Sequence, residues 1–141
     1  MGKYSIDSNQ NGKVAIFDTG TGQQISQWWN WIEDDGLIKG ESEYYIAKNE
    51  TGNEAIFHKD NPGKRISQWW DGIYKYGLVD GKSEHYIVRN EKRYKAIFHK
   101  DKPNTPLTRW GHTNFIDGII AGRSKYYIIP KTYSILTTIP K

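Results

Sequence analysis

Residues 66–87 read Ile-Ser-Gln-Trp-Trp-Asp-Gly-Ile-Tyr-Lys-Tyr-Gly-Leu-Val-Asp-Gly-Lys-Ser-Glu-His-Tyr-Ile, and nearly the same text precedes this stretch while a more divergent copy follows it. The copies are evenly spaced, since Trp28, Trp69 and Trp110 are each 41 residues apart. A fixed period of this size is typical of repeated supersecondary units. We therefore predict a single domain over 1–141, built from three repeats at about 10–50, 51–91 and 92–131.

Each repeat includes two short apolar stretches joined by turn residues. Asn11-Gly12 separates a predicted N-terminal strand at 3–8 from the next apolar stretch, and both residues tolerate the positive φ of a tight hairpin. Equivalent hairpins are predicted further along the chain, and a C-terminal strand is expected to complete the sheet. These predicted strands are 44–48 with 54–58, 86–89 with 95–99, and 132–139.

A helix is predicted after each hairpin. In the first repeat, the spacing of one helix face is met by Ile25, Trp28, Trp29 and Ile32, and the second repeat has the same pattern. A hydroxyl residue near the start of each stripe is the expected N-cap, and a glycine after it is the expected C-terminal stop. The caps are Ser26, Ser67 and Thr108, and the glycines are Gly36, Gly77 and Gly118.

These elements favour an α+β fold, in which three hairpin-plus-helix repeats place their helices on a largely antiparallel sheet. Three repeats of this total length also fit a β-trefoil, which is the structural alternative. The helical stripes argue against a trefoil, because that fold has no place for three capped helices.

Composition excludes several classes of protein. The chain has no cysteine, which rules out disulfides, thiolate metal ligands and a cysteine nucleophile. Its N-terminus has no basic-then-apolar leader, and no apolar run approaches the roughly 18 residues of a membrane span. We therefore expect a cytoplasmic protein with no membrane partner.

Charge differs sharply between the repeats, although the net charge is only +4. Residues 10–50 carry three basic and seven acidic side chains, 51–91 carry six of each, and 92–131 carry nine basic and two acidic side chains. A solubility requirement alone would not produce this gradient. The third repeat is therefore the first place to look for a charged partner.

Two His-Lys-Asp sequences are the strongest candidates for chemistry. His58 and Asp60, like His99 and Asp101, are two residues apart and would share one side of an extended strand, where they could begin a metal or acid–base site. Two such groups per repeat fall short of a closed site, so strand-end residues entering a turn are the favoured interpretation. We expect no enzyme, no catalytic residue, no metal and no cofactor.

The aromatic residues divide into two sets. The tryptophans at 28, 69 and 110 are expected to pack in the core. Tyr45, Tyr86 and Tyr127 would point away from the neighbouring isoleucines, because successive strand residues face opposite ways. An open tyrosine face could stack bases, hold sugar rings or form a protein interface, whereas a covered face would be more core.

Nucleic acid is the first partner that we expect, because the third repeat places many cations near tyrosines. A solvated basic surface is the simpler interpretation of the same charges. A protein partner or homo-oligomer ranks second, and a carbohydrate, which would require matching sites in all three repeats, ranks third. The candidate nucleic-acid-binding residues are Lys92, Arg93, Tyr94, Lys95, Lys100, Lys102, Arg109, Arg123, Lys125 and Tyr127.

Overall fold

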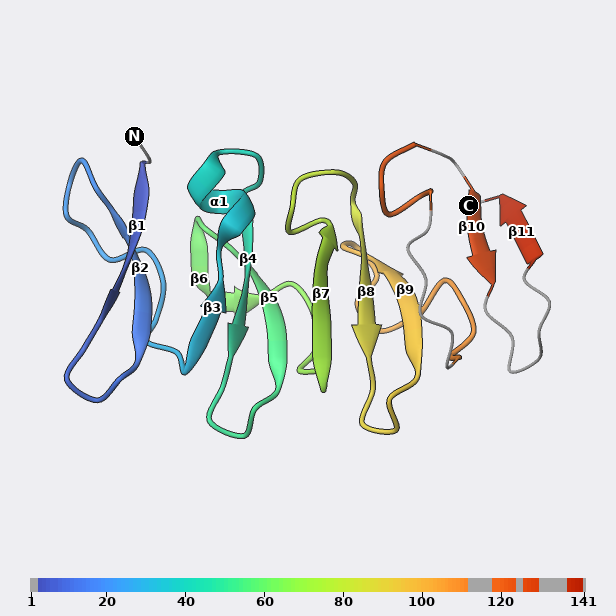
Figure 1. Ribbon diagram of the computed structural model, residues 1–141, viewed down its shortest axis with the longest axis horizontal. Helices are drawn as coiled ribbons and strands as arrows, with labels where there is room; N and C mark the ends of the chain where they lie inside the picture. Colours follow the sequence, from blue (N-terminus) through green and yellow to red (C-terminus); the bar gives the residue numbers. More distant parts are fainter. Residues whose placement is uncertain (1–2, 112–117, 124–125, 130–136, 141) are drawn as a thin grey trace.

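The computed structural model describes residues 3–111, 118–123, 126–129 and 137–140, the last two ranges by their backbone only. Strands dominate the described chain, and they lie side by side along an elongated molecule with β1 at one end and β10 and β11 at the other (Figure 1). The elements are β1 (Tyr4–Ser8), β2 (Val14–Asp18), β3 (Trp31–Glu33), α1 (Asp35–Lys39), β4 (Tyr44–Lys48), β5 (Glu54–His58), β6 (Asn61–Arg65), β7 (Gly72–Gly77), β8 (His85–Arg89), β9 (Lys95–His99), β10 (Tyr126–Ile129) and β11 (Thr137–Pro140).

All strand pairs between these elements are antiparallel, and they form separate small sheets. The strand orders are β1-β2, β3-β4-β5-β6, β7-β8-β9 and β10-β11. The three predicted hairpins are present as β1–β2, β4–β5 and β8–β9, in equivalent registers that pair an isoleucine with an isoleucine at the centre. Of the predicted C-terminal strand at 132–139, residues 132–136 lie outside the described chain, and β11 spans Thr137–Pro140.

One asparagine closes each hairpin turn. The Oδ1 atom of Asn49 accepts hydrogen bonds from the backbone N–H groups of Thr51 and Asn53, at 3.1 and 3.0 Å. Asn9 and Asn90 make the same pair of bonds in the other two hairpins. This side-chain bonding to the backbone two and four residues on explains why the same turn forms three times. We call these turns the first tip (9–13), the second tip (49–53) and the third tip (90–94).

The helices predicted in the first two repeats are wrong, and so is the α+β assignment. Of the third predicted helix, residues 112–117 lie outside the described chain. The segments after the hairpins run back along them: the backbone N–H of Trp29 donates to the Val14 carbonyl at 2.8 Å, and Trp70 and Gly111 pair in the same way with Glu54 and Lys95. Backbone groups that bond to a neighbouring strand cannot also form helical bonds. The only helix in the described residues is the five-residue α1, and the linear array in Figure 1 is not the closed threefold arrangement of a β-trefoil.

The hydroxyl residues that were expected to cap helices have another role. Ser26, Ser67 and Thr108 are buried, and each hydroxyl accepts a hydrogen bond from a backbone N–H in the second strand of the preceding hairpin. The donors are Ile16, Ile56 and Ile97, at 2.9, 3.0 and 3.0 Å. The repeated hydroxyl therefore ties the returning segment to its hairpin.

The glycines that were expected to end helices are also placed differently. Gly36 lies inside α1, Gly77 ends β7 and Gly118 lies in a turn. Gly81, the second glycine of its repeat, lies where its turn touches the equivalent turn of the preceding repeat at Glu41. A Cβ on Gly81 would lie 1.9 Å from the Glu41 carbonyl oxygen, a distance that no side chain can adopt. Close stacking of the repeats thus depends on this glycine.

The hairpins stack face to face, so the core lies between them. One face of β4–β5 packs toward β2 with Tyr45 and Phe57, and the other packs toward β7 with Ile46 and Ile56. Tyr45 is 0 % exposed and stacks on Phe57, and the next hairpin repeats this arrangement with Tyr86 and Phe98. The tyrosine face is therefore covered in both hairpins, and Tyr127 is described by its backbone only.

The tryptophans link neighbouring repeats. The rings of Trp29 and Trp69 lie 5.5 Å apart, and those of Trp70 and Trp110 lie 5.4 Å apart. Trp69 and Trp110 are partly buried in these contacts, as core packing predicts. Trp28 differs, because 38 % of its surface is exposed. The core interpretation therefore holds for two of the three equivalent tryptophans.

Candidate binding surface

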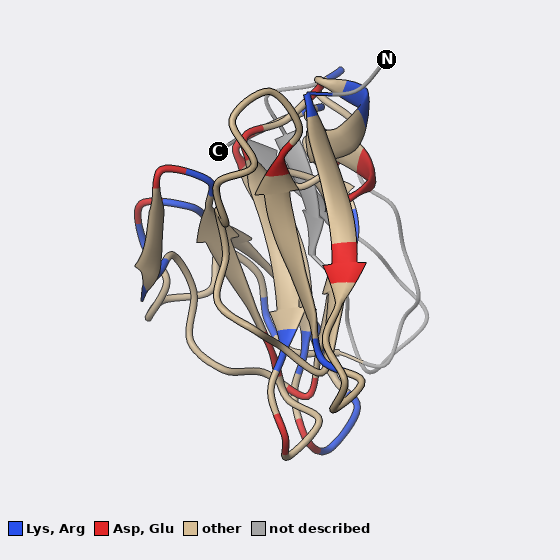
Figure 2. Ribbon diagram, turned by 90° about the vertical axis from the view of Figure 1, so that its left-hand side faces the viewer, with Lys and Arg blue, Asp and Glu red and all other residues tan. Residues whose placement is uncertain are grey.

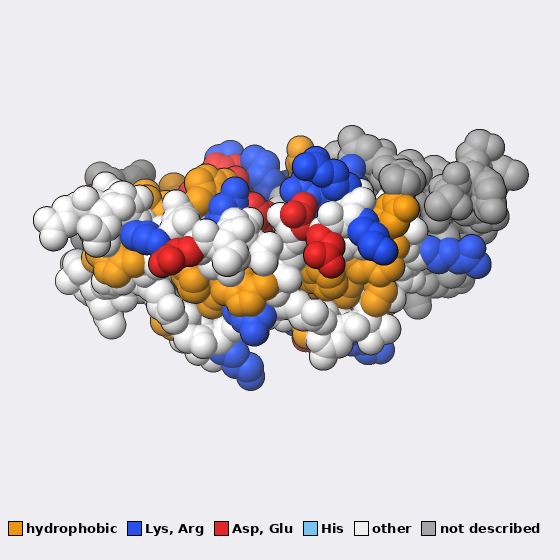
Figure 3. All heavy atoms as spheres, turned by 90° about the horizontal axis from the view of Figure 1, so that it is seen from below, with side chains coloured by type: hydrophobic (Ala, Val, Ile, Leu, Met, Phe, Trp, Pro, Cys, Tyr) orange, Lys and Arg blue, Asp and Glu red, His pale blue; other side chains and the backbone are white. Residues whose placement is uncertain are grey.

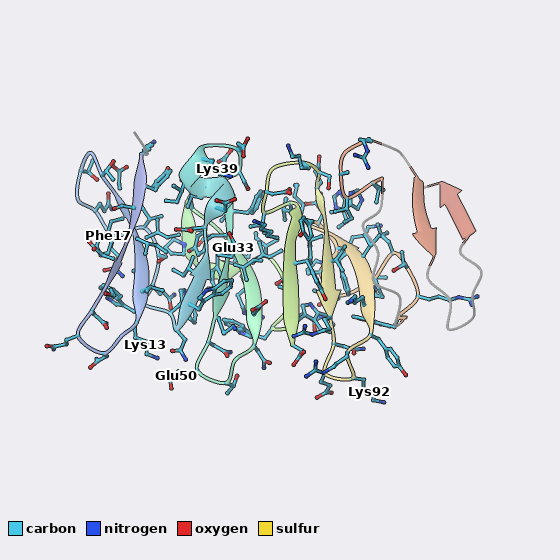
Figure 4. All side chains as sticks on the ribbon, in the orientation of Figure 1. Lys13, Phe17, Glu33, Lys39, Glu50 and Lys92 are labelled. Carbon is cyan, nitrogen blue, oxygen red and sulfur yellow. The ribbon has the colours of Figure 1, made fainter. Side chains whose placement is uncertain are left out.

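Charged residues lie mostly near the ends of the strands, while the strands between them are mostly uncharged (Figure 2). The three tips lie on one side of the molecule, as Lys13, Glu50 and Lys92 show (Figure 4). Seen from this side, hydrophobic patches alternate with charged groups (Figure 3). This tip side therefore presents both apolar and charged groups.

The third tip carries an unusual arginine. Arg93 has a φ of 70°, and it is the only non-glycine residue with positive φ in the described chain. The equivalent residues in the other tips are Gly12 and Gly52, with φ of 80° and 87°. A left-handed backbone costs a residue with a Cβ roughly 1–2 kcal/mol. An exposed cation thus occupies a position where glycine would be more stable.

The candidate nucleic-acid-binding residues do not form one patch. Lys92 and Arg93 are exposed on the third tip, and Lys95 lies at its base with its Nζ 5.4 Å from the centre of the Tyr74 ring. Lys100 follows β9 at the opposite end of the strands, where its Nζ lies 3.2 Å from Asp101. Tyr94 is half-buried at the third tip, and Arg109 is exposed before Trp110. Lys102 and Arg123 are exposed toward the end opposite the tip. Lys125 lies outside the described residues, and Tyr127 is described by its backbone alone.

A groove of about 310 Å³ lies between the first and second tips. We call it the aromatic groove, and it is lined by Lys13, Trp28, Trp29, Asn30, Asn49, Glu50 and Thr51. The Nζ of Lys13 donates to Asn30 Oδ1 at 2.5 Å and lies 3.3 Å from a carboxylate oxygen of Glu50. Sequence reasoning missed this groove, because its walls come from residues up to 38 positions apart. The one available signal was that Lys13 and Asn30 are not repeated.

The matching position in the next repeat holds an ion pair. Asp71 stands where the first repeat has Asn30, and its carboxylate accepts a hydrogen bond from Arg89 Nε at 2.7 Å. This bond raises the pKa of the Arg89 guanidinium. The guanidinium also covers Gly72, since a Cβ there would lie 2.9 Å from it. The two equivalent positions, Asn30 and Asp71, therefore differ in chemistry although the backbone repeats.

The two histidine clusters form at the end of the strands opposite the tips. His58 Nδ1 accepts the backbone N–H of Asp60 at 3.1 Å, and its Nε2 lies 3.2 Å from a carboxylate oxygen of Glu43. Lys59 reaches both acids, with its Nζ 3.0 Å from Asp60 and 3.8 Å from Glu43. Hydrogen bonding from Lys59 lowers the pKa of Asp60.

The second cluster, of Glu84, His99, Lys100 and Asp101, repeats this geometry. In each cluster the histidine and the two acids bring possible metal ligands within 4.8 Å of one another. The lysine ammonium already supplies a positive charge between the acids, and one histidine nitrogen is occupied by the backbone. Each cluster thus lies where a strand ends and the chain enters a turn, as expected from sequence, and its lysine forms ion pairs with both acids.

No protein-family model matches this chain, and a search of curated proteins found no relative. Among the residues that the structure describes, no helix has the length and apolar character to cross a membrane.

Proposed function

We propose that this protein is a non-catalytic binding protein that contacts nucleic acid through the third tip. The observation that carries the proposal is Arg93, whose side chain is kept at a left-handed position that costs stability. Backbone strain of this kind is concentrated at functional sites. Lys92 stands beside it and adds a second exposed cation.

The charge environment of the third tip supports a phosphate ligand. In the described part of the chain, Lys92 and Arg93 take part in no ion pair, whereas Lys13 at the first tip pairs with Glu50. Cations without a carboxylate partner can exchange their counterions for phosphates, which is the main source of affinity for nucleic acid. The third tip therefore suits a polyanion better than the first tip does.

The roles of the repeated polar residues support a non-catalytic function. The asparagines close the hairpin turns, and the buried hydroxyls bond to backbone amides. A catalytic site requires several different groups that converge on one point and remain available to a substrate. These side chains are already used by the fold.

The test is binding to a fluorescently labelled single-stranded DNA oligonucleotide, measured by anisotropy over a range of salt concentrations. We expect the affinity to fall steeply as salt rises. In the double variant Lys92→Glu with Arg93→Glu, the affinity should fall at least about tenfold, and the slope against log salt should flatten by about 0.7 for each lost phosphate contact.

The matched control is Thr51→Glu, which places a carboxylate at the position of the second tip that corresponds to Lys92. It should leave the affinity close to that of the wild type. Absence of binding, binding that does not depend on salt, or equal losses in both variants would contradict the proposal.

A protein partner or homo-oligomer is the second candidate. Trp31 and Tyr76 are 42 % and 40 % exposed, and large aromatic residues are enriched in protein interfaces. Sedimentation velocity at low and high salt tests self-association. A single species at the monomer mass in both conditions would remove the homo-oligomer.

A further inference from the structure

We infer that the aromatic groove between the first and second tips is a subsite for a neutral carbohydrate. This site is separate from the third tip, and it does not depend on the proposed nucleic-acid binding. The inference is based on an exposed indole, a set of fixed polar groups and a balanced charge, all within one groove of about 310 Å³.

The indole of Trp28 is held in place but remains open to solvent. Its ring packs edge to face with Phe17 at 5.8 Å, yet 38 % of the residue is exposed. The equivalent Trp69 is more buried, because it also packs on Trp29 of the preceding repeat. A fixed, accessible indole offers a flat apolar surface against which the C–H face of a sugar ring can pack.

The polar groups of the groove supply both donors and acceptors. Asn30 Oδ1 accepts from Lys13, and the amide group of Asn30 retains its two N–H donors. Glu50 has an 83 % exposed side chain, and its carboxylate can accept hydrogen bonds from hydroxyl groups. Sugar hydroxyls donate and accept, so this mixed set suits them. A few placed polar groups beside aromatic walls are typical of small-ligand sites.

Charge selects a neutral sugar rather than a phosphate-bearing ligand. Lys13 is paired with Glu50, so the groove has no free cation of its own among its lining residues. Residues 10–50 also carry seven acidic side chains against three basic ones. A polyanion would meet repulsion here, in contrast to the third tip, and a neutral ligand would not.

The groove is a single subsite and not one of a series. The equivalent of Asn30 in the next repeat is Asp71, which is bound by Arg89. The equivalent of Lys13 at the second tip is Asn53. Matching sites in all repeats, which a repeated carbohydrate-binding module would have, are therefore not found in the described residues. One subsite predicts weak binding of short sugars.

The experiment titrates the whole protein with cellohexaose, chitohexaose and maltohexaose, followed by tryptophan fluorescence and calorimetry. At least one of these neutral oligosaccharides should bind saturably. Trp28→Ala should weaken that binding about tenfold, which is the effect of losing one stacked ring. Asn30→Ala and Glu50→Gln should each weaken it several-fold. Lys92→Glu with Arg93→Glu should leave it unchanged.

Trp28→Phe separates loss of the ring from loss of the fold, because it keeps an aromatic surface and should retain most of the affinity. Thermal melting verifies that each variant is folded, and the exposed Asn30 and Glu50 provide variants that do not disturb the core. The inference is overturned if wild type binds none of the three oligosaccharides, if the groove variants bind as wild type does, or if single-stranded DNA displaces the bound sugar.

Discussion

The β4–β5 and β8–β9 hairpins have nearly the same backbone but different tips. Both pair Tyr with Phe in the core, both close their turn with an asparagine and both receive a buried hydroxyl from the segment that follows. The second tip then has Thr51-Gly52-Asn53, whereas the third has Lys92-Arg93-Tyr94. The residues shared by the two hairpins are used for folding, whereas the third tip adds the exposed cations Lys92 and Arg93, the second of them at a cost in stability.

The largest effect is expected where consecutive turns touch. Gly81→Ala would drive a Cβ into the Glu41 carbonyl oxygen, so we expect it to lower the free energy of unfolding by more than about 3 kcal/mol or to prevent folding. Gly40→Ala is the matched control, because Gly40 also has positive φ but open space around it, and it should cost about 1–2 kcal/mol. Urea denaturation measures both. Equal losses would show that the turns do not touch as described.

The next largest loss of stability is expected when the buried hydroxyl of Ser67 is removed. Ser67→Ala leaves the N–H of Ile56 without its acceptor, which should cost about 1–3 kcal/mol. Gln68→Ala removes an exposed side chain that bonds to the Pro103 carbonyl, and it should cost less than about 0.5 kcal/mol. Hydrogen exchange at the Ile56 amide should become faster in the first variant only. Unchanged exchange there would assign the hydroxyl no structural role.

Buried tyrosines predict sensitivity to alkali. Burial raises the pKa of the Tyr45 and Tyr86 phenols well above its ordinary value, so the unfolded chain loses these protons first. The contribution of the two tyrosines to the free energy of unfolding should therefore be fully present below about pH 10. Above that pH, the free energy of unfolding should fall by up to about 1.4 kcal/mol per pH unit for each tyrosine.

Tyr45→Phe and Tyr86→Phe should each flatten this fall. At neutral pH both variants should be close to wild type, since neither hydroxyl has a hydrogen-bond partner among the described residues. The measurement is urea denaturation at a series of pH values. A fall of the same steepness in the double variant would refute the assignment to these phenols.

The hairpins could be predicted from sequence because their signals are local. An asparagine, a turn and two alternating apolar stretches fall within about fifteen residues, and nothing distant alters them. The conformation of the segments predicted as helices could not be read from local signals alone. The spacing of Ile25, Trp28 and Ile32 fits a helix face, but Trp29 bonds to the backbone of Val14 and packs edge to face against a tryptophan of the next repeat. Tertiary pairing overrode the local pattern.

The candidate sites were predictable only in part. Comparison of the three tips exposes Arg93 in the sequence, since the equivalent residues are glycines. The aromatic groove depends on the ion pair between Lys13 and Glu50 and on the position of Trp28 in the first repeat, where no tryptophan of an earlier repeat in the described chain covers it. Both features arise from the way the repeats stack, which the sequence does not state. The spread of the third repeat's cations to both ends of the strands likewise follows from the topology.

The most direct test of the central claim is Arg93→Gly, measured for stability and for binding to single-stranded DNA, with Gly52→Arg as its mirror. Because glycine relieves the left-handed backbone, Arg93→Gly should raise the free energy of unfolding by about 1 kcal/mol while it weakens DNA binding severalfold. Gly52→Arg should lower stability by a similar amount and leave affinity little changed. An Arg93→Gly protein that is more stable and binds DNA as wild type does would contradict the claim.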